Sequence, residues 1–501
     1  MRYMNSVRTG AFALCVFSSP ALADLTARQV WQDWGSHSAS YGQTVTGTEM
    51  TVGDSLVVTD IKISMKLPGG EVNGAIDRVE FKENGDGTVT VILSPDYPVS
   101  LKTKNPDGDV EEMETLFRQD GLKMIASGDE TTIRYDVTGP GLSFEMTRLT
   151  VNGKERPLEL LIRIADIAAS YGFTLTETGQ RSVMSEGTAR SVNFRVASSV
   201  PMDESAPGEV SSALFLGEIT DISGKSSSIV PDGMNSLNLW TAIGTGFVGE
   251  GEISFGATSY SSTVKMPDQE ATTTAVRSGA GKLAIELSEA GLRYGVTQTD
   301  VVLSFTSPIL PIPELNVAME RSESRLMLPL VPSDEPRDFA LMSTTKGLTL
   351  NEDFWAMFDP SGVLPRDPAT MVLDLSGKMR LPVDVLAPTL KNYRPEVEVE
   401  SVALNDLTLS MGGAILTGTG AFTVDNSTAV PNPDGTVNLR LEGGNALLDN
   451  LVTMGLVPPD QANGLRMMIG LFARPGEGED TLVSDITFKD RQILANGQRL
   501  K

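Results

Sequence analysis

Apolar and polar residues alternate over long stretches of the chain, as in Ile61, Ile63, Met65 and Leu67. Alternation with a period of two is typical of a strand that buries one of its faces. The same pattern returns at residues 89–93, 133–137, 142–146, 192–196, 407–411 and 437–441. Turn residues separate the stretches, at 84–87, 105–108, 139–141 and 432–435. Because such turns supply the positive φ that hairpins require, the pattern predicts an antiparallel meander.

One short pattern occurs twice. Residues 160–177 read LLIRIADIAASYGFTLTE and residues 283–300 read LAIELSEAGLRYGVTQTD, and the copies align on Tyr171-Gly172 and Tyr294-Gly295. In each copy an alternating arm is followed by a turn-like break and a second arm that begins at the tyrosine. We therefore predict a β-hairpin for each copy, whether the match reflects an internal duplication or a coincidence.

A few helices are expected on this sheet. Thr26 and Gln29 form the pattern of a capping box, and Trp31 and Trp34 share the face that would dock on strands. Further helices are predicted at 237–243 with Trp240, after Asn351 with Trp355, at 447–452, and after Asp460 with the apolar positions 465, 468, 469 and 472. All four tryptophans fall in these segments, so large aromatic side chains are expected to fix the helices to the sheet.

The chain has 501 residues, more than one hydrophobic core usually supports. We predict an α+β fold dominated by extended, curved antiparallel sheets. Its regions are an N-terminal helix with antiparallel strands (24–235), a middle β region containing the second copy as a hairpin (236–335) and a C-terminal α+β region (336–501). The Pro-rich stretch 331–337 suggests the last boundary.

The first 23 residues have the layout of a secretory signal peptide. Arg2 and Arg8 precede an apolar run, and Ala21-Leu22-Ala23 forms a small-residue cleavage site before Asp24. The run is shorter than the ~20 residues of a membrane span, although an uncleaved anchor is the alternative. Cleavage after Ala23 predicts a periplasmic protein without cysteine, because Cys15 is removed.

Charge and composition exclude several classes of site. The net charge of −25 becomes −27 when Arg2 and Arg8 are lost, and such a surface repels nucleic acid. With His37 as the only histidine and no cysteine after cleavage, we expect no zinc or redox metal and no thiol chemistry. His37 is expected to be an exposed residue just past the first helix. No nucleotide-binding loop is present, so we predict no cofactor and assign no catalytic residue.

Three further segments have an ordinary structural explanation and a functional alternative. The acidic stretch 105–114 reads as a solvated turn, because its glycine does not fit a calcium loop. Residues 364–368 (LPRDP) read as a rigid turn with an Arg–Asp pair, or as a ligand contact. Met467 and Met468 read as helix core, or as the lining of an adaptable apolar groove.

Several motifs resemble the domain-of-unknown-function 2125 family of exported bacterial proteins. The motifs are 355–362 (WAMFDPSG) with 364–368, then 416–420 (LTGTG), 466–468 (RMM), 470–473 (GLFA) and 495–500 (ANGQRL). The two tryptophans of the first helix and Tyr41-Gly42-Gln43 also fit, so the resemblance extends over the mature chain. It implies a periplasmic, β-rich protein and transfers no catalytic residue. Long sheets of envelope proteins are also similar in architecture to the lipid-handling AsmA-like group.

From these observations we expect a non-enzymatic envelope protein that holds an apolar, lipid-like ligand or a partner segment on a curved sheet. The first alternative is a structural or interaction module without a groove. The second is a hydrolase that uses carboxylates, which would require a cleft with two carboxylates of strongly shifted pKa.

Overall fold

A computed structural model describes residues 25–40, 42–67, 69–105, 107–129, 131–176, 178–201, 210–231, 243–381, 397–428 and 430–500. Strands make up 67% of the chain and helices 10%, which confirms a β-dominated α+β fold. The predicted signal peptide, Tyr41 and the helix around Trp240 lie outside the described residues, apart from Ile243 at the end of that helix.

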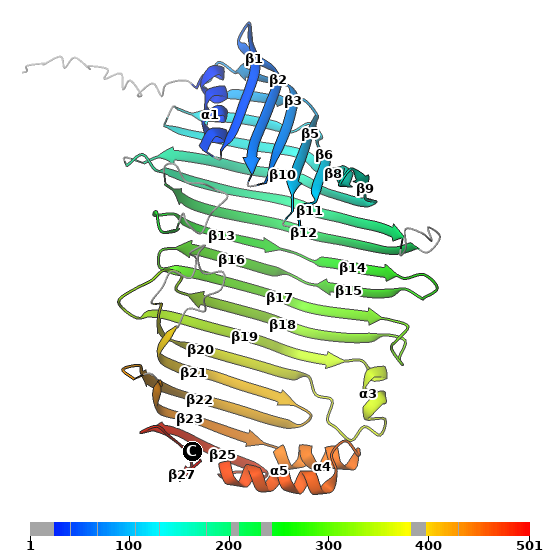
Figure 1. Ribbon diagram of the computed structural model, residues 1–501, viewed down its shortest axis with the longest axis vertical. Coiled ribbons are helices and arrows are strands. Elements are labelled where there is room, and N and C mark those ends of the chain that lie inside the picture. The colour runs from blue at the N-terminus through cyan, green and yellow to red at the C-terminus, as the bar shows by residue number, and fades with distance from the viewer. Residues whose placement is uncertain are drawn as a thin grey trace, which may run out of the picture.

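All described strands belong to one sheet, and every pair of neighbours is antiparallel (Figure 1). The strands of the N-terminal part are β1 (Gln43–Val52), β2 (Ser55–Leu67), β3 (Gly70–Glu83), β4 (Val89–Leu93), β5 (Asp96–Lys104), β6 (Val110–Gln119), β7 (Lys123–Gly128), β8 (Thr132–Val151), β9 (Lys154–Glu155), β10 (Leu158–Leu175), β11 (Arg181–Pro201) and β12 (Val210–Val230). They are followed by β13 (Val248–Phe255), β14 (Thr258–Lys265), β15 (Thr272–Ser278), β16 (Gly281–Ser288), β17 (Gly291–Thr306), β18 (Leu315–Leu328), β19 (Arg337–Leu350), β20 (Ala369–Arg380), β21 (Glu398–Met411), β22 (Ala414–Asp425), β23 (Asn432–Glu442), β24 (Arg474–Pro475), β25 (Thr481–Lys489), β26 (Gln492–Ala495) and β27 (Gln498–Arg499).

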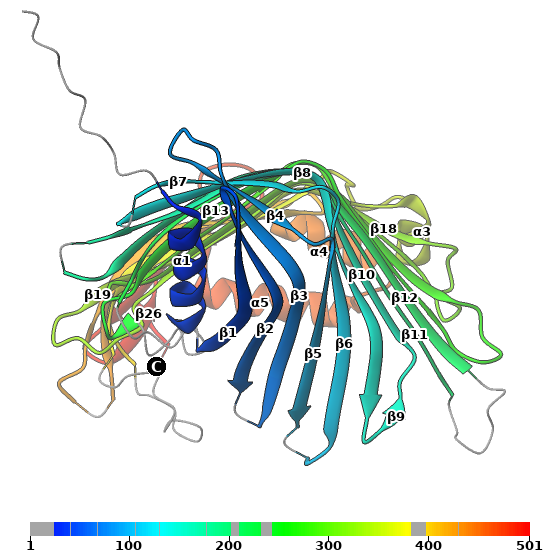
Figure 2. The same cartoon turned by 90° about the horizontal axis from the view of Figure 1, so that it is seen from above.

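The sheet is bent into an arch that runs along the molecule (Figure 2). Long strands such as β18 cross the ridge and descend on both sides of it. Helices α1 (Ala27–Ser40), α4 (Gly444–Thr453) and α5 (Pro459–Phe472) lie under the arch, α1 at one end and α4 with α5 at the other. We call the face of the sheet that these helices cover the inner face.

We attribute the bend to a line of irregular residues in the middle of the strands, the crease. Asp60, Asp166, Asp221 and Asp300 have φ angles of 52°, 49°, 50° and 50°. Left-handed backbone is disfavoured for residues with a Cβ, and Asp tolerates it better than most. At Asp166, for example, the ladder with β11 is paired on both sides but not at this residue, so the strand changes direction there.

The crease also explains how both arms of a strand keep apolar side chains on the inner face. In β2 the inward residues are Leu56 and Val58 before Asp60, and Ile61 and Ile63 after it. A regular strand alternates strictly, and a one-residue irregularity exchanges the faces. The apolar positions thus move from even to odd numbers across the crease.

Helix α1 is held by a well-packed core at the N-terminal end. The reciprocal capping box is present, since Thr26 N donates to Gln29 Oε1 (2.8 Å) and Gln29 N donates to Thr26 Oγ1 (3.3 Å). As expected, Trp31 and Trp34 dock on strands, with ring centroids 6.0 and 5.3 Å from that of Phe81 in β3. This core fixes α1 to the inner face and covers the end of the arch.

Two predicted turns are wrong because they are crease positions. The first copy of the repeated pattern is one continuous strand, β10, and only the second copy forms a hairpin, β16 with β17. Residues 139–141 likewise lie inside β8. The turn predicted at 432–435 is also wrong, because these residues pair with 422–425 as the start of β23. Glycine, proline and Asp mark an interruption of regular structure, which is a bend here and not a reversal.

Pairing continues across both predicted region boundaries. Strand β12 pairs with β13 and β14, and β18 pairs with β19. The three regions therefore share one sheet, and their division into subdomains stays a prediction.

Candidate functional site

The inner face carries one continuous, in-register row of side chains across neighbouring strands. The row consists of Tyr135, Tyr171, Ser185, Ser226, Gly251, Ile285, Tyr294, Leu326, Leu341 and Leu375. We call it the inner row. Directly opposed residues on one face of a sheet are side-chain neighbours, so the row forms a strip along the arch.

The middle of this strip is apolar and uncovered by the described residues. Ile285, Tyr294 and Leu341 expose 46%, 37% and 39% of their surface, and the adjacent inner residue Ile253 exposes 44%. Contiguous exposed apolar side chains on a folded protein mark a surface for ligands or partners. The alternation of apolar and polar residues in the sequence thus produces an apolar surface on the inside of the arch.

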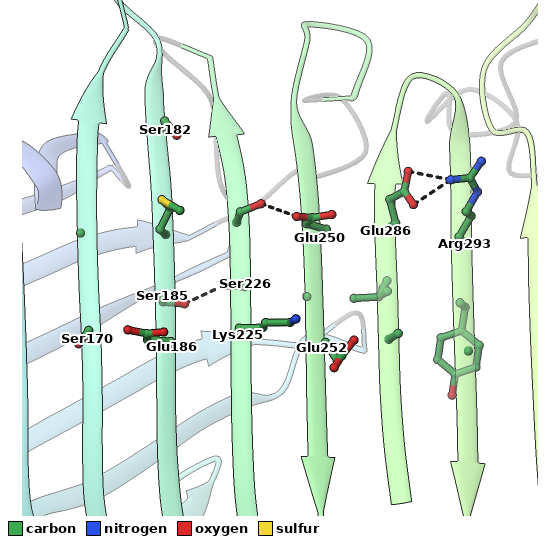
Figure 3. Close-up of a pocket in the computed structure, with 18 of the residues that line it drawn as sticks. Ser170, Ser182, Ser185, Glu186, Lys225, Ser226, Glu250, Glu252, Glu286 and Arg293 are labelled. Atoms are coloured by element: carbon green, nitrogen blue, oxygen red, sulfur yellow. Dashed lines mark hydrogen bonds and ion pairs between the residues drawn. The ribbon is translucent and has the colours of Figure 1, made fainter.

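The opposite face carries charge at the neighbouring positions. Met184, Glu250, Glu286 and Arg293 belong to one row of this outer face, with Glu286 and Arg293 ion-paired at 3.0 Å. Figure 3 shows the charged side chains standing above these strands. Charged side chains on the outer face and apolar ones inside match a sheet whose outer face is in water.

A hollow of about 1030 Å³, lined by described residues, lies over these polar positions of β8 to β20. Its lining includes Arg134, Glu186, Lys225, Glu252 and Arg325, together with the exposed Met184. The hollow is an open furrow in which oppositely charged groups alternate. Its lining also includes the apolar residues Met327 and Met342, and Ile285, Tyr294 and Leu326 of the inner row.

A polar cluster occupies the α1 end of the inner row, and we call it the α1 cluster. Tyr135 Oη donates to Asp33 Oδ2 (2.7 Å), and Tyr171 Oη lies 3.3 Å from Nε2 of His37. The guanidinium of Arg181, at the start of β11, lies 5.4 Å from the ring centroid of Phe173. Helix α1 and strands β8, β10 and β11 therefore bring polar groups together on a largely apolar face.

Burial shifts the pKa values of this cluster. Burial raises the pKa of Asp33, although the hydrogen bond from Tyr135 opposes the shift. Burial lowers the pKa of His37, which nearby Asp33 opposes and Arg181 reinforces. Burial, and then the charge of Asp33, raise the pKa of Tyr135 far above its ordinary value. The cluster thus favours a neutral His37.

The structure corrects the expectation for His37. The residue lies inside α1 and is half-buried against Tyr171, with ring centroids 5.7 Å apart, and is not an exposed residue past the helix. Its neighbour comes from a strand 134 residues later, which no local pattern reveals.

Met467 and Met468 are not core residues, because they are 75% and 50% exposed on α5. Helix α5 begins at Pro459, so Asp460 lies in its first turn and does not cap it. Ala462 is the buried residue of this helix, and Leu471 is exposed with the methionines. The apolar arc of α5 is therefore largely uncovered by the described residues.

The other two candidate segments have structural roles. Residues 364–368 form a turn in which Arg366 pairs with Glu352 and lies over the ring of Trp355, in helix α3 (Glu352–Phe358), at 5.6 Å. This replaces the expected Arg–Asp pair. The acidic stretch 105–114 contains the β5–β6 turn, where Gly108 N donates to Asn105 O (3.0 Å), as predicted. Glu112 in this stretch pairs with Lys102 at 2.6 Å.

One sequence signal of the site was missed. The crease residues share a motif, Thr-Asp-Ile at 59–61 and 220–222, Ala-Asp-Ile at 165–167 and Thr-Asp-Val at 299–301. Its recurrence, with the change from even to odd apolar positions, would have predicted a bent sheet with one apolar face.

The comparisons with known proteins add a family and no activity. A model of the family DUF2125, described as an uncharacterized protein conserved in bacteria, matches residues 248–500. No curated protein and no solved structure matches the chain. The matched part runs from β13 to the last strand, so the N-terminal part of the resemblance stays a prediction. No helix in the described ranges combines the length and apolar character needed to cross a membrane.

Proposed function

The chain belongs to the DUF2125 family, and we propose that it is an exported protein that holds an apolar, lipid-like ligand against the inner face of its arch. The observation that carries the proposal is the exposed apolar part of the inner row, Ile285, Tyr294 and Leu341, between two ends where helices cover the arch. Burying these side chains against a hydrocarbon chain would stabilise the complex by about 25 cal/mol per Å² of apolar surface.

Export is part of the same proposal. It is supported by the signal-peptide pattern ending at Ala21-Leu22-Ala23 and by the confinement of cysteine to residue 15. A lipid-binding protein in the periplasm would carry lipid through water, which requires an apolar surface that is shielded from solvent when loaded.

The test compares one substitution on each face. Delipidated protein is titrated with a fluorescent fatty acid and with a fluorescent phospholipid. Ile285→Lys places a charge on the apolar strip, whereas Met184→Lys makes the same change at an exposed apolar position of the outer face, beside Glu186. We expect wild type and Met184→Lys to bind equally and Ile285→Lys to bind at least ~10-fold more weakly, the equivalent of ~1.4 kcal/mol.

Two results would contradict the proposal. If the wild-type protein takes up neither probe, it does not bind the proposed class of ligand. If Met184→Lys loses binding and Ile285→Lys retains it, the ligand binds in the charged furrow of the outer face and not on the inner face.

A second candidate function, the docking of an envelope protein, is favoured by the uncovered apolar arc of α5. A photo-crosslinking residue at Leu471 would then capture one defined protein in cells, and the same residue at the exposed polar position Asn463 would not. Equal capture at both positions, or capture at neither, would oppose this function.

A further inference from the structure

The inner row changes character along its length. Its α1 end consists of hydrogen-bonding side chains, Tyr135, Tyr171, Ser185 and Ser226, of which the two serines lie 2.7 Å apart through their hydroxyls. After Gly251 the row is Ile285, Tyr294, Leu326, Leu341 and Leu375. A surface that is polar at one end and apolar at the other matches an amphiphile in one orientation only.

The polar end also carries the positive charge of Arg181, one nitrogen of which lacks a hydrogen-bond partner among the described residues. Arg181 lies on the same face as Ser185, and its Nη1 is buried with no hydrogen bond to any described group. A buried guanidinium nitrogen without an acceptor is costly, and carboxylate or phosphate oxygens are its best partners. Asp33 already accepts a hydrogen bond from Tyr135.

The apolar part of the row has the length of one lipid chain. From Ile285 in β16 to Leu341 in β19 the exposed part of the row crosses three strand spacings, or ~14 Å at ~4.8 Å each. The hydrocarbon core of a bilayer is ~30 Å thick, so the chains of one leaflet span ~15 Å. A single acyl chain therefore covers the exposed strip.

We propose that the ligand is an anionic amphiphile with an acyl chain, bound with its head at Arg181, Tyr171, Ser185 and Ser226 and its chain along Ile285 to Leu341. This inference rests on the proposed function and adds the class of head group and the direction of binding. The shared chemistry is an anionic oxygen head, supplied by a fatty-acid carboxylate or by a lysophospholipid phosphate.

The orientation is tested by quenching of tryptophan fluorescence. In the variant Trp240→Phe/Trp355→Phe the remaining tryptophans are Trp31 and Trp34 of α1. Fatty acids brominated beside the carboxylate are expected to quench them, and fatty acids brominated at the methyl end are not. Adding Leu341→Trp introduces emission with the reverse preference. Equal quenching by both probes, or the opposite preference, would overturn the orientation, whereas absence of any binding would refute the proposed function itself.

The head group is tested with a matched pair of arginine variants. Arg181→Gln is expected to weaken binding of a fatty acid about 10-fold while leaving the corresponding fatty alcohol unchanged. Arg134→Gln, on the outer face, is expected to change neither. A parallel titration with lysophospholipid shows whether carboxylate or phosphate binds more tightly. If Arg181→Gln binds the fatty acid and the lysophospholipid as tightly as the wild type does, the assignment of an anionic head is wrong.

Discussion

Asp166 and Arg190 form an ion pair at the position where β10 and β11 interrupt their ladder and bend together. Both side chains are exposed, so the pair adds little stability. Its significance is geometric, because the left-handed backbone of Asp166 is repeated at Asp60, Asp221 and Asp300. The arch, and with it the apolar inner face, depends on this line of residues.

The left-handed backbone of the crease determines which substitutions Asp221 tolerates, since its φ is 50°. Glycine adopts this conformation without strain, and a β-branched residue is strained by about 1–2 kcal/mol. We expect Asp221→Gly to leave the free energy of unfolding nearly unchanged and Asp221→Val to lower it by about that amount in urea titrations. Equal destabilisation by both variants would mean that the left-handed backbone is not the constraint.

Aromatic rings lie over glycines of the neighbouring strand on the inner face. A Cβ at Gly217 would lie 1.9 Å from Cζ of Phe194. We expect Gly217→Ala to displace this ring and to cost about 1–3 kcal/mol of unfolding free energy. In the background Phe194→Leu the same change should cost much less, so a double-mutant cycle measures the contact. If the losses of unfolding free energy caused by the two substitutions are additive, the ring of Phe194 does not contact position 217.

The single histidine gives a direct reading of the α1 cluster. Because burial lowers the pKa of His37 from its ordinary 6.5, its contribution to stability is complete above pH 6.5 and is lost as pH falls through the folded pKa. Asp33, with a raised pKa, has the opposite sign. The other facing groups are Tyr135, Tyr171 and Arg181.

We therefore expect the imidazole signal in NMR to titrate below pH 6.5. The fall in stability between about pH 7 and pH 5 should be smaller in His37→Gln than in wild type. A pKa at or above 6.5 would show that His37 is not buried against Tyr171.

The C-terminal helices should respond unequally to substitution. Leu448 of α4 is buried, and Leu448→Ala is expected to cost about 2–5 kcal/mol. Met467→Gln on α5 should change stability by less than about 0.5 kcal/mol, because the side chain is exposed. Thermal unfolding of both variants checks this. A large loss of stability in Met467→Gln would indicate that the apolar arc of α5 is packed against other parts of the protein.

Local patterns in the sequence predicted what local interactions determine. The Thr26–Gln29 capping box, the strands around 61–67 and the hairpin of 283–300 depend on residues close in sequence. The breaks at 139–141 and 166 were misread, because a bend and a reversal have similar turn residues. Only the register with strands some 20 or more residues away distinguishes them, as in the pairing of Ala165 with Ser191.

The site required that register as well. Tyr171 and Ile285 belong to the two copies of the repeated pattern, but nothing in the sequence places them beside each other or beside Ser226. They become one strip only when successive strands are aligned. The apolar character of the face could be predicted from the alternation, but its change from polar to apolar could not.

The most direct test is native mass spectrometry of the protein recovered from the bacterial envelope without delipidation. The account predicts a polypeptide that begins at Asp24 and carries one bound lipid in wild type and Met184→Lys, with the lipid lost in Ile285→Lys. A chain that carries no lipid in any variant, or the same lipid in all three, would contradict an apolar inner face that binds it.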